Sequence, residues 1–391
     1  MLRLKYFDAE APDRNGDLVD QLRANDQSVL QTFPRGQAGY AAPQAALSQA
    51  IEAWLTHRGQ RAEPVIVMVH GYMFDPTNSP DTSPDSPFDS IYGSPPAVNY
   101  HESWLPLVGE CDQAGGNVRE NAIAFCYKSI ASLADVRNAG WVNSYQHAVF
   151  DLAPRAARAL ASILGSVADK APLVRILAHS LGTRTTTQAM RLARARLRGT
   201  LDRIVMLDGA EFCVDAAASF TGCEQDVFNI VNRHDSVLRI GGDQACAPMR
   251  AVGTLGSCVI GYDGLGGNDR WLDLQLDNSN LAQWLAAGNA PDGSPYTINP
   301  MAEEGSHPVA GLDHWACYTN DGNRALVRDL LLSDVMTVPR MKQHGVPGGT
   351  SAPAYGMFNN QPIPPTPLTL MDRQRLLAQG GGAAGGLSAG G

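Results

Sequence analysis

Residues 173–190 read LVRILAHSLGTRTTTQAM, and the change of pattern inside this stretch decides the fold. Its first seven residues form a short apolar run that predicts a buried strand, and a helical pattern follows over about 181–197. Ser180 stands at the junction. Ala178 and Gly182 are small enough to permit a sharp strand-to-helix turn, which would project the Ser180 hydroxyl beyond the end of the sheet.

Further apolar runs on both sides of this stretch predict strands and helices in alternation. Runs typical of buried strands occur at residues 64–71, 120–127, 203–209 and 227–233, and a helical period occupies 141–168. Strand and helix in alternation favour right-handed crossovers between parallel strands. We therefore predict an α/β fold with a mainly parallel central sheet and helices on both faces.

Composition limits the classes of partner and location. The 391-residue chain has a formal charge of −9, which argues against nucleic acid as a partner. No stretch approaches the roughly 18 apolar residues of a membrane span, and the amino terminus lacks the apolar core of a signal peptide. We expect a cytoplasmic protein, with export through the carboxy-terminal tail as an open alternative. The seven cysteines show no CxxC spacing, so we expect reduced thiols, with disulfides left open.

Two motifs match a known superfamily. AHSLG at residues 178–182 has the A-x-S-x-G form of a nucleophile elbow, and VHGY at 69–72 ends an earlier apolar run. An acid after a later strand and a carboxy-terminal histidine complete the set. Over about residues 60–335 the chain resembles the α/β-hydrolase-fold serine hydrolases, the esterase and lipase superfamily.

This resemblance implies a role for each motif. Ser180 would be the nucleophile, and the backbone N–H groups of Tyr72 and Leu181 would form the oxyanion hole. If the loop is offset by one residue, Met73 replaces Tyr72. We expect His70 to orient this loop rather than to act as the base.

The acid and the base are chosen by chain order. Asp235 directly follows the strand predicted at 227–233, where the superfamily carries its acid, and Asp208, one strand earlier, is the alternative acid. His314 and His307 lie after Asp235 and before the last regular helix. We prefer His314, because its distance to that helix suits the superfamily layout.

The resemblance also divides the chain. Residues 1–60 are predicted as an N-terminal lead-in, 61–335 as the α/β-hydrolase catalytic domain, and 336–391 as a Pro- and Gly-rich flexible tail. Insertions are expected at about 73–117 and 240–300. The aromatic residues of the first insertion suggest a lid or substrate wall.

We therefore expect a serine hydrolase that cleaves a small-molecule carboxylic ester through an acyl-enzyme, with Ser180, His314 and Asp235 as its triad. No metal or cofactor is predicted. An amidase or thioesterase would use the same triad, because all three reactions pass through the same oxyanion. A non-catalytic binding protein of this fold is the alternative from another class.

Overall fold

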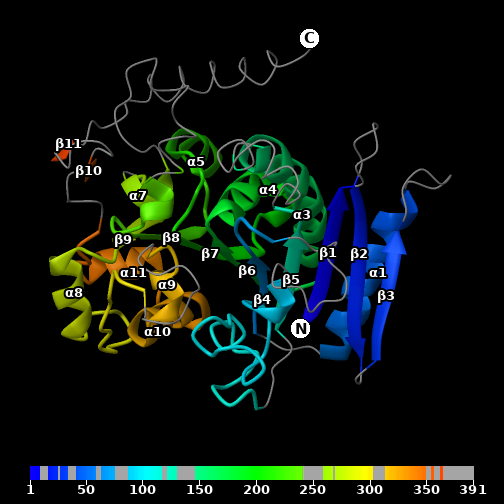
Figure 1. The fold of residues 1–391 in the computed structure, drawn as a ribbon, viewed down its shortest axis with the longest axis horizontal. Coiled ribbons are helices and arrows are strands. Elements are labelled where there is room, and N and C mark those ends of the chain that lie inside the picture. The colour runs from blue at the N-terminus through cyan, green and yellow to red at the C-terminus, as the bar shows by residue number, and fades with distance from the viewer. Residues whose placement is uncertain are drawn as a thin grey trace, which may run out of the picture.

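The computed structural model is built around a nine-stranded sheet in the order β3-β2-β1-β5-β4-β6-β7-β8-β9 (Figure 1). The structure describes residues 1–8, 16–24, 27–33, 41–58, 63–74, 87–116, 121–129, 145, 147–239, 241, 259–266, 269–302, 313–348, 354–355 and 362–363.

The strands of this sheet are β1 (Leu2–Asp8), β2 (Gly16–Ala24), β3 (Gln27–Phe33), β4 (Val65–Val69), β5 (Ala122–Tyr127), β6 (Val174–His179), β7 (Leu201–Leu207), β8 (Asp226–Val231) and β9 (Trp271–Gln275), and β10 (Ala354–Tyr355) pairs with β11 (Pro362–Ile363). The α-helices are α1 (Ala41–Arg58), α3 (Ala153–Ala168), α4 (Leu181–Leu197), α5 (Cys213–Phe220), α7 (Ile260–Asp263), α8 (Ser279–Ala286), α9 (Ala316–Thr319), α10 (Asp321–Leu332) and α11 (Val338–Gln343). A 3-10 turn, η1, covers Pro87–Asp89, and a π-helical turn, η2, covers Ala148–Leu152.

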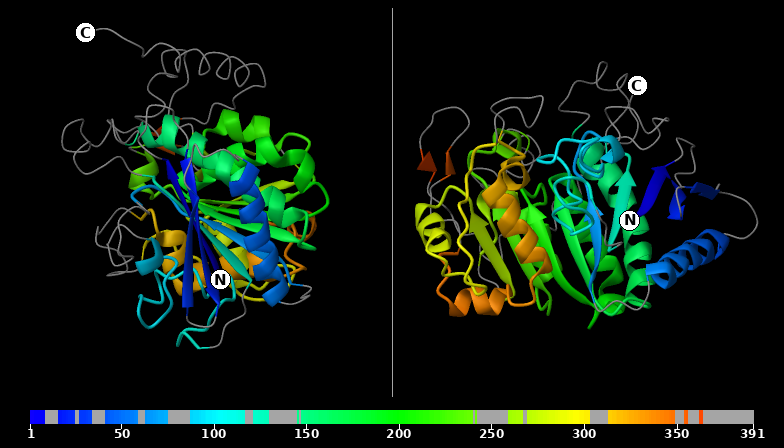
Figure 2. Two further views of the ribbon diagram at one scale, coloured as in Figure 1. Left: turned by 90° about the vertical axis from the view of Figure 1, so that its right-hand side faces the viewer. Right: turned by 90° about the horizontal axis from the view of Figure 1, so that it is seen from below.

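Seven strands of the sheet, β1 and β4 to β9, run parallel to one another. The central strands are mainly apolar, as in VIVMV of β4 and AIAFCY of β5, because both faces of the sheet are covered. In β4, Val65, Val67 and Val69 join one core cluster with residues of α1, α3, α4 and α5, whereas Ile66 and Met68 join a second cluster with residues of α8, α10 and α11. The two helical layers lie on opposite sides of the sheet (Figure 2). The predicted α/β class with a parallel sheet is confirmed.

The amino-terminal segment is part of the sheet rather than a lead-in. β1 pairs with β5 in parallel, and β2 and β3 extend the same edge in antiparallel fashion. Leu2 and Leu4 are buried, and Arg3 is placed over the ring of Phe88 with 4.7 Å between the guanidinium carbon and the ring centroid. Polar residues alternate with apolar ones in LRLKYFD, so this segment lacks the continuous apolar run by which the other strands were predicted.

The described part of the first insertion, residues 87–116, packs into the core. Phe88, Tyr92 and Trp104 are buried there. The Tyr92 hydroxyl donates to the backbone carbonyls of Met68 and Phe125, at 3.1 and 3.2 Å. Tyr92 therefore joins this segment to β4 and β5, whereas Trp104 lies edge to face with the ring of His179. Residues 75–86 of the insertion lie outside the described part.

The start of the predicted tail is also packed. Met336, Val338 and Met341 are buried in the cluster that contains α8 and α10. The Val338 N–H donates to the Asp226 carboxylate at 3.0 Å and so joins α11 to the beginning of β8. The folded unit therefore extends past the predicted boundary at residue 335, because three apolar side chains in an otherwise Pro- and Gly-rich segment complete the core.

Truncation after Leu332 is expected to destabilise the protein strongly, whereas truncation after Gly348 is not. The shorter chain lacks Met336, Val338 and Met341, and burial of three such side chains contributes on the order of 5 kcal/mol. Free energies of unfolding from urea titrations of both truncated proteins and the full chain measure the difference. Equal stability of the two truncated chains would show that α11 does not contribute to the core.

Candidate active site

Ser180 occupies a strained turn between β6 and α4. Its φ is 53° and its ψ is −125°, a conformation that costs a residue with a side chain about 1–3 kcal/mol. Four hydrogen bonds hold the turn: the Ser180 N–H donates to the Leu207 carbonyl at 2.9 Å, and the Ser180 carbonyl accepts from the N–H groups of Ala210 and Thr183 at 3.0 Å each and from the Thr183 hydroxyl at 2.7 Å. The sequence-predicted strand-to-helix turn is therefore present, and strain is maintained at the residue proposed as nucleophile.

Two glycines allow the backbone to close around this serine. A Cβ at Gly182 would lie 2.4 Å from the carbonyl oxygens of Val69 and His70, so α4 begins directly against the end of β4. A Cβ at Gly71 would lie 2.8 Å from the Cβ of Ser180. The absence of side chains at both positions brings the loop after β4 into contact with the Ser180 turn.

His70 holds that loop in a defined orientation. Its Nε2 accepts from the Tyr127 N–H at 3.0 Å, so the ring proton is on Nδ1, which donates to the Gly71 carbonyl at 2.8 Å. The peptide unit between Gly71 and Tyr72 is planar and trans, so fixing the Gly71 carbonyl also fixes the opposite direction of the Tyr72 N–H. Leu181 is the first residue of α4, and its N–H has no partner within the helix. The two expected oxyanion donors are thus set by His70 and by the start of α4.

The buried His70 predicts acid destabilisation. Burial lowers the pKa of His70 from 6.5 to about 3, so the folded protein keeps this ring neutral where the unfolded chain binds a proton. Stability is therefore lost as pH falls from 6.5 towards 3, at up to about 1.4 kcal/mol per pH unit. Free energies of unfolding measured between pH 6.5 and 3.5 should fall less steeply in His70→Gln than in wild type.

Comparing the pH dependence of the free energy of unfolding in wild type and His70→Gln separates the effect of His70 from that of groups whose titration changes stability in the opposite direction. Burial raises the pKa of Glu211 to about 8 and that of Asp263 to about 7, so both stabilise the folded state less as pH rises. Both groups remain in His70→Gln. Parallel slopes for the variant and wild type would mean that His70 is not kept neutral in the folded state.

Asp235 and His314 form the central pair of the site. Nδ1 of His314 is 2.6 Å from one carboxylate oxygen of Asp235, and the other oxygen accepts from the Leu238 N–H at 2.8 Å. The Asp235 side chain is fully buried and the His314 side chain is 5% exposed. The structure therefore brings these two sequence-predicted residues together through Nδ1 of the imidazole.

His179 connects this pair to Ser180. It is the chain neighbour of Ser180, its Nε2 lies 3.1 Å from the His314 carbonyl, and its ring centroid is 4.7 Å from that of His314. Trp104 and Tyr318 contact the His179 ring edge to face. Among the described residues the Ser180 hydroxyl makes no hydrogen bond, and hydrogen bonds of this kind are often long before a substrate is bound.

The alternative acid, Asp208, lies near the pair but does not bond to His314. It follows β7 with φ 43°, and its side chain is fully buried. Burial and the neighbouring Asp235 carboxylate raise the pKa of Asp208 well above its usual value. Asp235 accepts the hydrogen bond of His314 Nδ1, whereas neither carboxylate oxygen of Asp208 has a hydrogen-bond partner of normal geometry among the described residues, so the geometry favours Asp235.

Asn232 supports the site and was missed by the sequence analysis. Its side-chain amide donates to the carbonyls of Pro300 and Asp313, at 2.8 and 3.1 Å, and so anchors the loop that carries His314. Asn232 is fully buried. A polar residue at the end of a buried strand, three positions before the candidate acid, was the available signal.

A surface hollow of about 460 Å³ lies far along α4 from Ser180. It is lined by Arg191, Leu192, Arg194, Ala195, Arg198, Gly222, Cys223, Glu224 and Gln225. Because Ser180 precedes the first residue of α4 and these arginines flank its last turn, this hollow does not serve the Ser180 site.

Some sequence expectations fall on residues that the structure does not describe. His307, the alternative base, is one of them, and so are Cys246 and Cys258. The five cysteines among the described residues, Cys111, Cys126, Cys213, Cys223 and Cys317, are free thiols.

Comparisons with known proteins assign no family to this chain. No family model matches it, and neither the curated proteins nor the solved structures contain a match. Within the described residues, none of the helices combines the length and apolar character needed to cross a membrane.

Proposed function

We propose that this protein is a serine hydrolase of the α/β-hydrolase fold that cleaves a carboxylic ester through an acyl-enzyme. The observation that carries the proposal is the buried Asp235–His314 hydrogen bond beside the strained turn of Ser180. Strain of this kind collects at functional sites, and a buried carboxylate on Nδ1 of a histidine is the arrangement that prepares Nε2 as a base.

In the proposed first half-reaction, Nε2 of His314 removes the Ser180 proton as the hydroxyl oxygen attacks the ester carbonyl. Asp235 holds the imidazole in the tautomer with hydrogen on Nδ1, and its charge stabilises the imidazolium that forms. The imidazolium then gives its proton to the leaving alcohol, and an acyl group remains on Ser180. In the second half-reaction His314 activates water, which releases the acid and restores Ser180.

The negative charge on the carbonyl oxygen would be stabilised by backbone donors. The N–H of Leu181 is at the amino-terminal end of α4, where the helix dipole favours negative charge. The second donor, the Tyr72 N–H, is directed by the His70 hydrogen bond to Gly71. Esters are favoured as substrates because their alkoxide leaving groups require less assistance from the acid than amine leaving groups do.

The proposal is tested with wild-type protein by a panel of p-nitrophenyl esters of graded acyl length together with a fluorophosphonate probe. We expect hydrolysis with a rapid first turnover, and covalent phosphonylation that peptide mapping assigns to Ser180. Labelling of a different serine would move the site, and the absence of both turnover and labelling would reject hydrolase function in favour of a binding role.

A further inference from the structure

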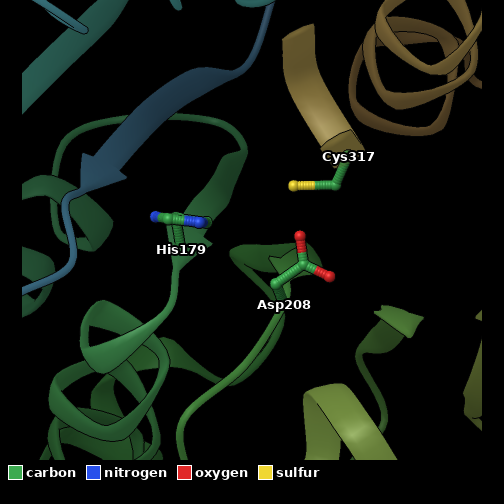
Figure 3. A group of neighbouring side chains, drawn as sticks. All are labelled: His179, Asp208 and Cys317. Carbon is green, nitrogen blue, oxygen red and sulfur yellow. The ribbon is translucent and has the colours of Figure 1, made fainter. Parts of the chain in front are cut away.

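Three side chains with metal-binding atoms, His179, Asp208 and Cys317, converge on one another in the interior of the protein (Figure 3). His179 comes from the end of β6, Asp208 follows β7, and Cys317 belongs to α9. One donor atom of each lies within 4.8 Å of the others, and all three residues are buried. The fold therefore gathers a nitrogen, an oxygen and a sulfur donor from elements far apart in the chain.

This donor set suits Zn²⁺. Zinc accepts imidazole nitrogen and carboxylate oxygen at about 2.0–2.2 Å and thiolate sulfur at about 2.3 Å, commonly with three protein ligands and one further position. Ligand atoms around such an ion lie about 3.3–3.8 Å apart, so closing by about 1 Å completes the site. A thiolate and a carboxylate also balance the double charge of the ion, which is required in a buried setting.

Asp208 supplies an independent indication of a ligand site. Neither of its carboxylate oxygens has a hydrogen-bond partner of normal geometry among the described residues, although the side chain is fully buried. The neighbouring Cys317 thiol interacts favourably with it but does not reach that geometry. Burial of a polar group without a partner is costly, and the proposed reaction does not use Asp208, because His314 is paired with Asp235.

We propose that His179, Asp208 and Cys317 form a binding site for Zn²⁺. The ion binds to the thiolate and carboxylate forms, and the protons that these groups carry are released to solvent. His179 also contacts the His314 carbonyl, and Asp208 lies close enough to Asp235 to interact with its charge. An ion bound here would therefore affect both His314 and Asp235. A positive charge beside Asp235 competes with the imidazolium for that carboxylate, so zinc should inhibit hydrolysis, a consequence that rests on the proposed function.

Metal binding is tested without turnover, by titrating the metal-free full-length protein with Co²⁺ as a spectroscopic substitute for zinc. We expect one equivalent to give the near-ultraviolet sulfur-to-cobalt charge-transfer absorption and the visible bands of tetrahedral cobalt, and excess Zn²⁺ to abolish both. Cys317→Ser should lose the charge-transfer absorption, and Asp208→Asn should weaken binding at least about tenfold. Cys111→Ser, which removes a buried thiol outside the cluster, is the matched control and should bind as wild type does.

The site is refuted if wild-type protein gives no thiolate–cobalt absorption, or if that absorption survives in Cys317→Ser. The wild-type result stands even if a variant fails to fold. Zinc inhibition of ester hydrolysis, present in wild type and lost in Cys317→Ser, then connects the site to activity. If the metal-free protein hydrolyses no ester, the proposed function fails, whereas the cobalt result still decides the metal site.

Discussion

Replacing Ser180 with alanine is expected to lower kcat for ester hydrolysis by about 10⁶-fold and to abolish fluorophosphonate labelling. The expected loss is large because no other group in the described site can form the acyl-enzyme, and the remaining oxyanion donors stabilise only attack by water. Alanine also keeps the Cβ that packs near Gly71, so the turn retains its shape. Initial rates with p-nitrophenyl acetate, and gel fluorescence after labelling, measure both effects.

Ser219→Ala is the matched control for this substitution. Ser219 is also buried, but its hydroxyl donates within α5 to the Asp215 carbonyl at 2.7 Å. The control should keep wild-type turnover and labelling. Because Ser180 has a positive φ, Ser180→Ala should also unfold at about the wild-type urea concentration, since alanine pays a similar conformational cost. Residual turnover above about 1% of wild type would place the nucleophile elsewhere.

Much of the fold could be predicted because most of its strands are buried on both faces. Such strands are continuous apolar runs, as in VIVMV of β4, and they can be recognised without knowledge of their neighbours. β1 could not be recognised in this way, because it alternates polar and apolar residues and obtains its burial from β5 and Phe88. The role of Met336 and Met341 likewise depends on a core to which residues far away in the chain contribute.

The candidate site likewise has features that local sequence determines and features that depend on tertiary packing. The Ser180 turn is a local steric requirement, and chain order is enough to select Asp235 and His314 as its expected partners. The contact of His179 with the His314 carbonyl depends instead on tertiary packing. The approach of Cys317 to Asp208 is of the same kind, because the two residues belong to separate elements and have no common motif. The Ser180 turn and its expected partners could therefore be predicted from the sequence, whereas the contacts of His179 and Cys317 around them could not.

Replacing Asp235 with asparagine is expected to lower kcat by about 10⁴-fold. The hydrogen bonds around Asp235 determine how the new amide would lie. The Leu238 N–H requires an acceptor, so the asparagine carbonyl oxygen should face Leu238 and its NH₂ group should face Nδ1 of His314. An NH₂ group donates to Nδ1 and thereby places the imidazole hydrogen on Nε2. That tautomer cannot accept the Ser180 proton.

Asp208→Asn provides the matched comparison, because it makes the same chemical change in a buried aspartate of the same site. Asp208 makes no hydrogen bond to His314, and burial together with the neighbouring Asp235 carboxylate raises its pKa well above the usual value, which favours the uncharged form that asparagine resembles. Its substitution should therefore change kcat little. Rates of both variants with p-nitrophenyl acetate between pH 6 and 9 distinguish the two acids, and hydroxide should partly restore turnover only in Asp235→Asn, where the base is disabled. A larger loss in Asp208→Asn than in Asp235→Asn would assign the acid to the end of β7, and His314 would then have to leave the partner that it contacts in this structure.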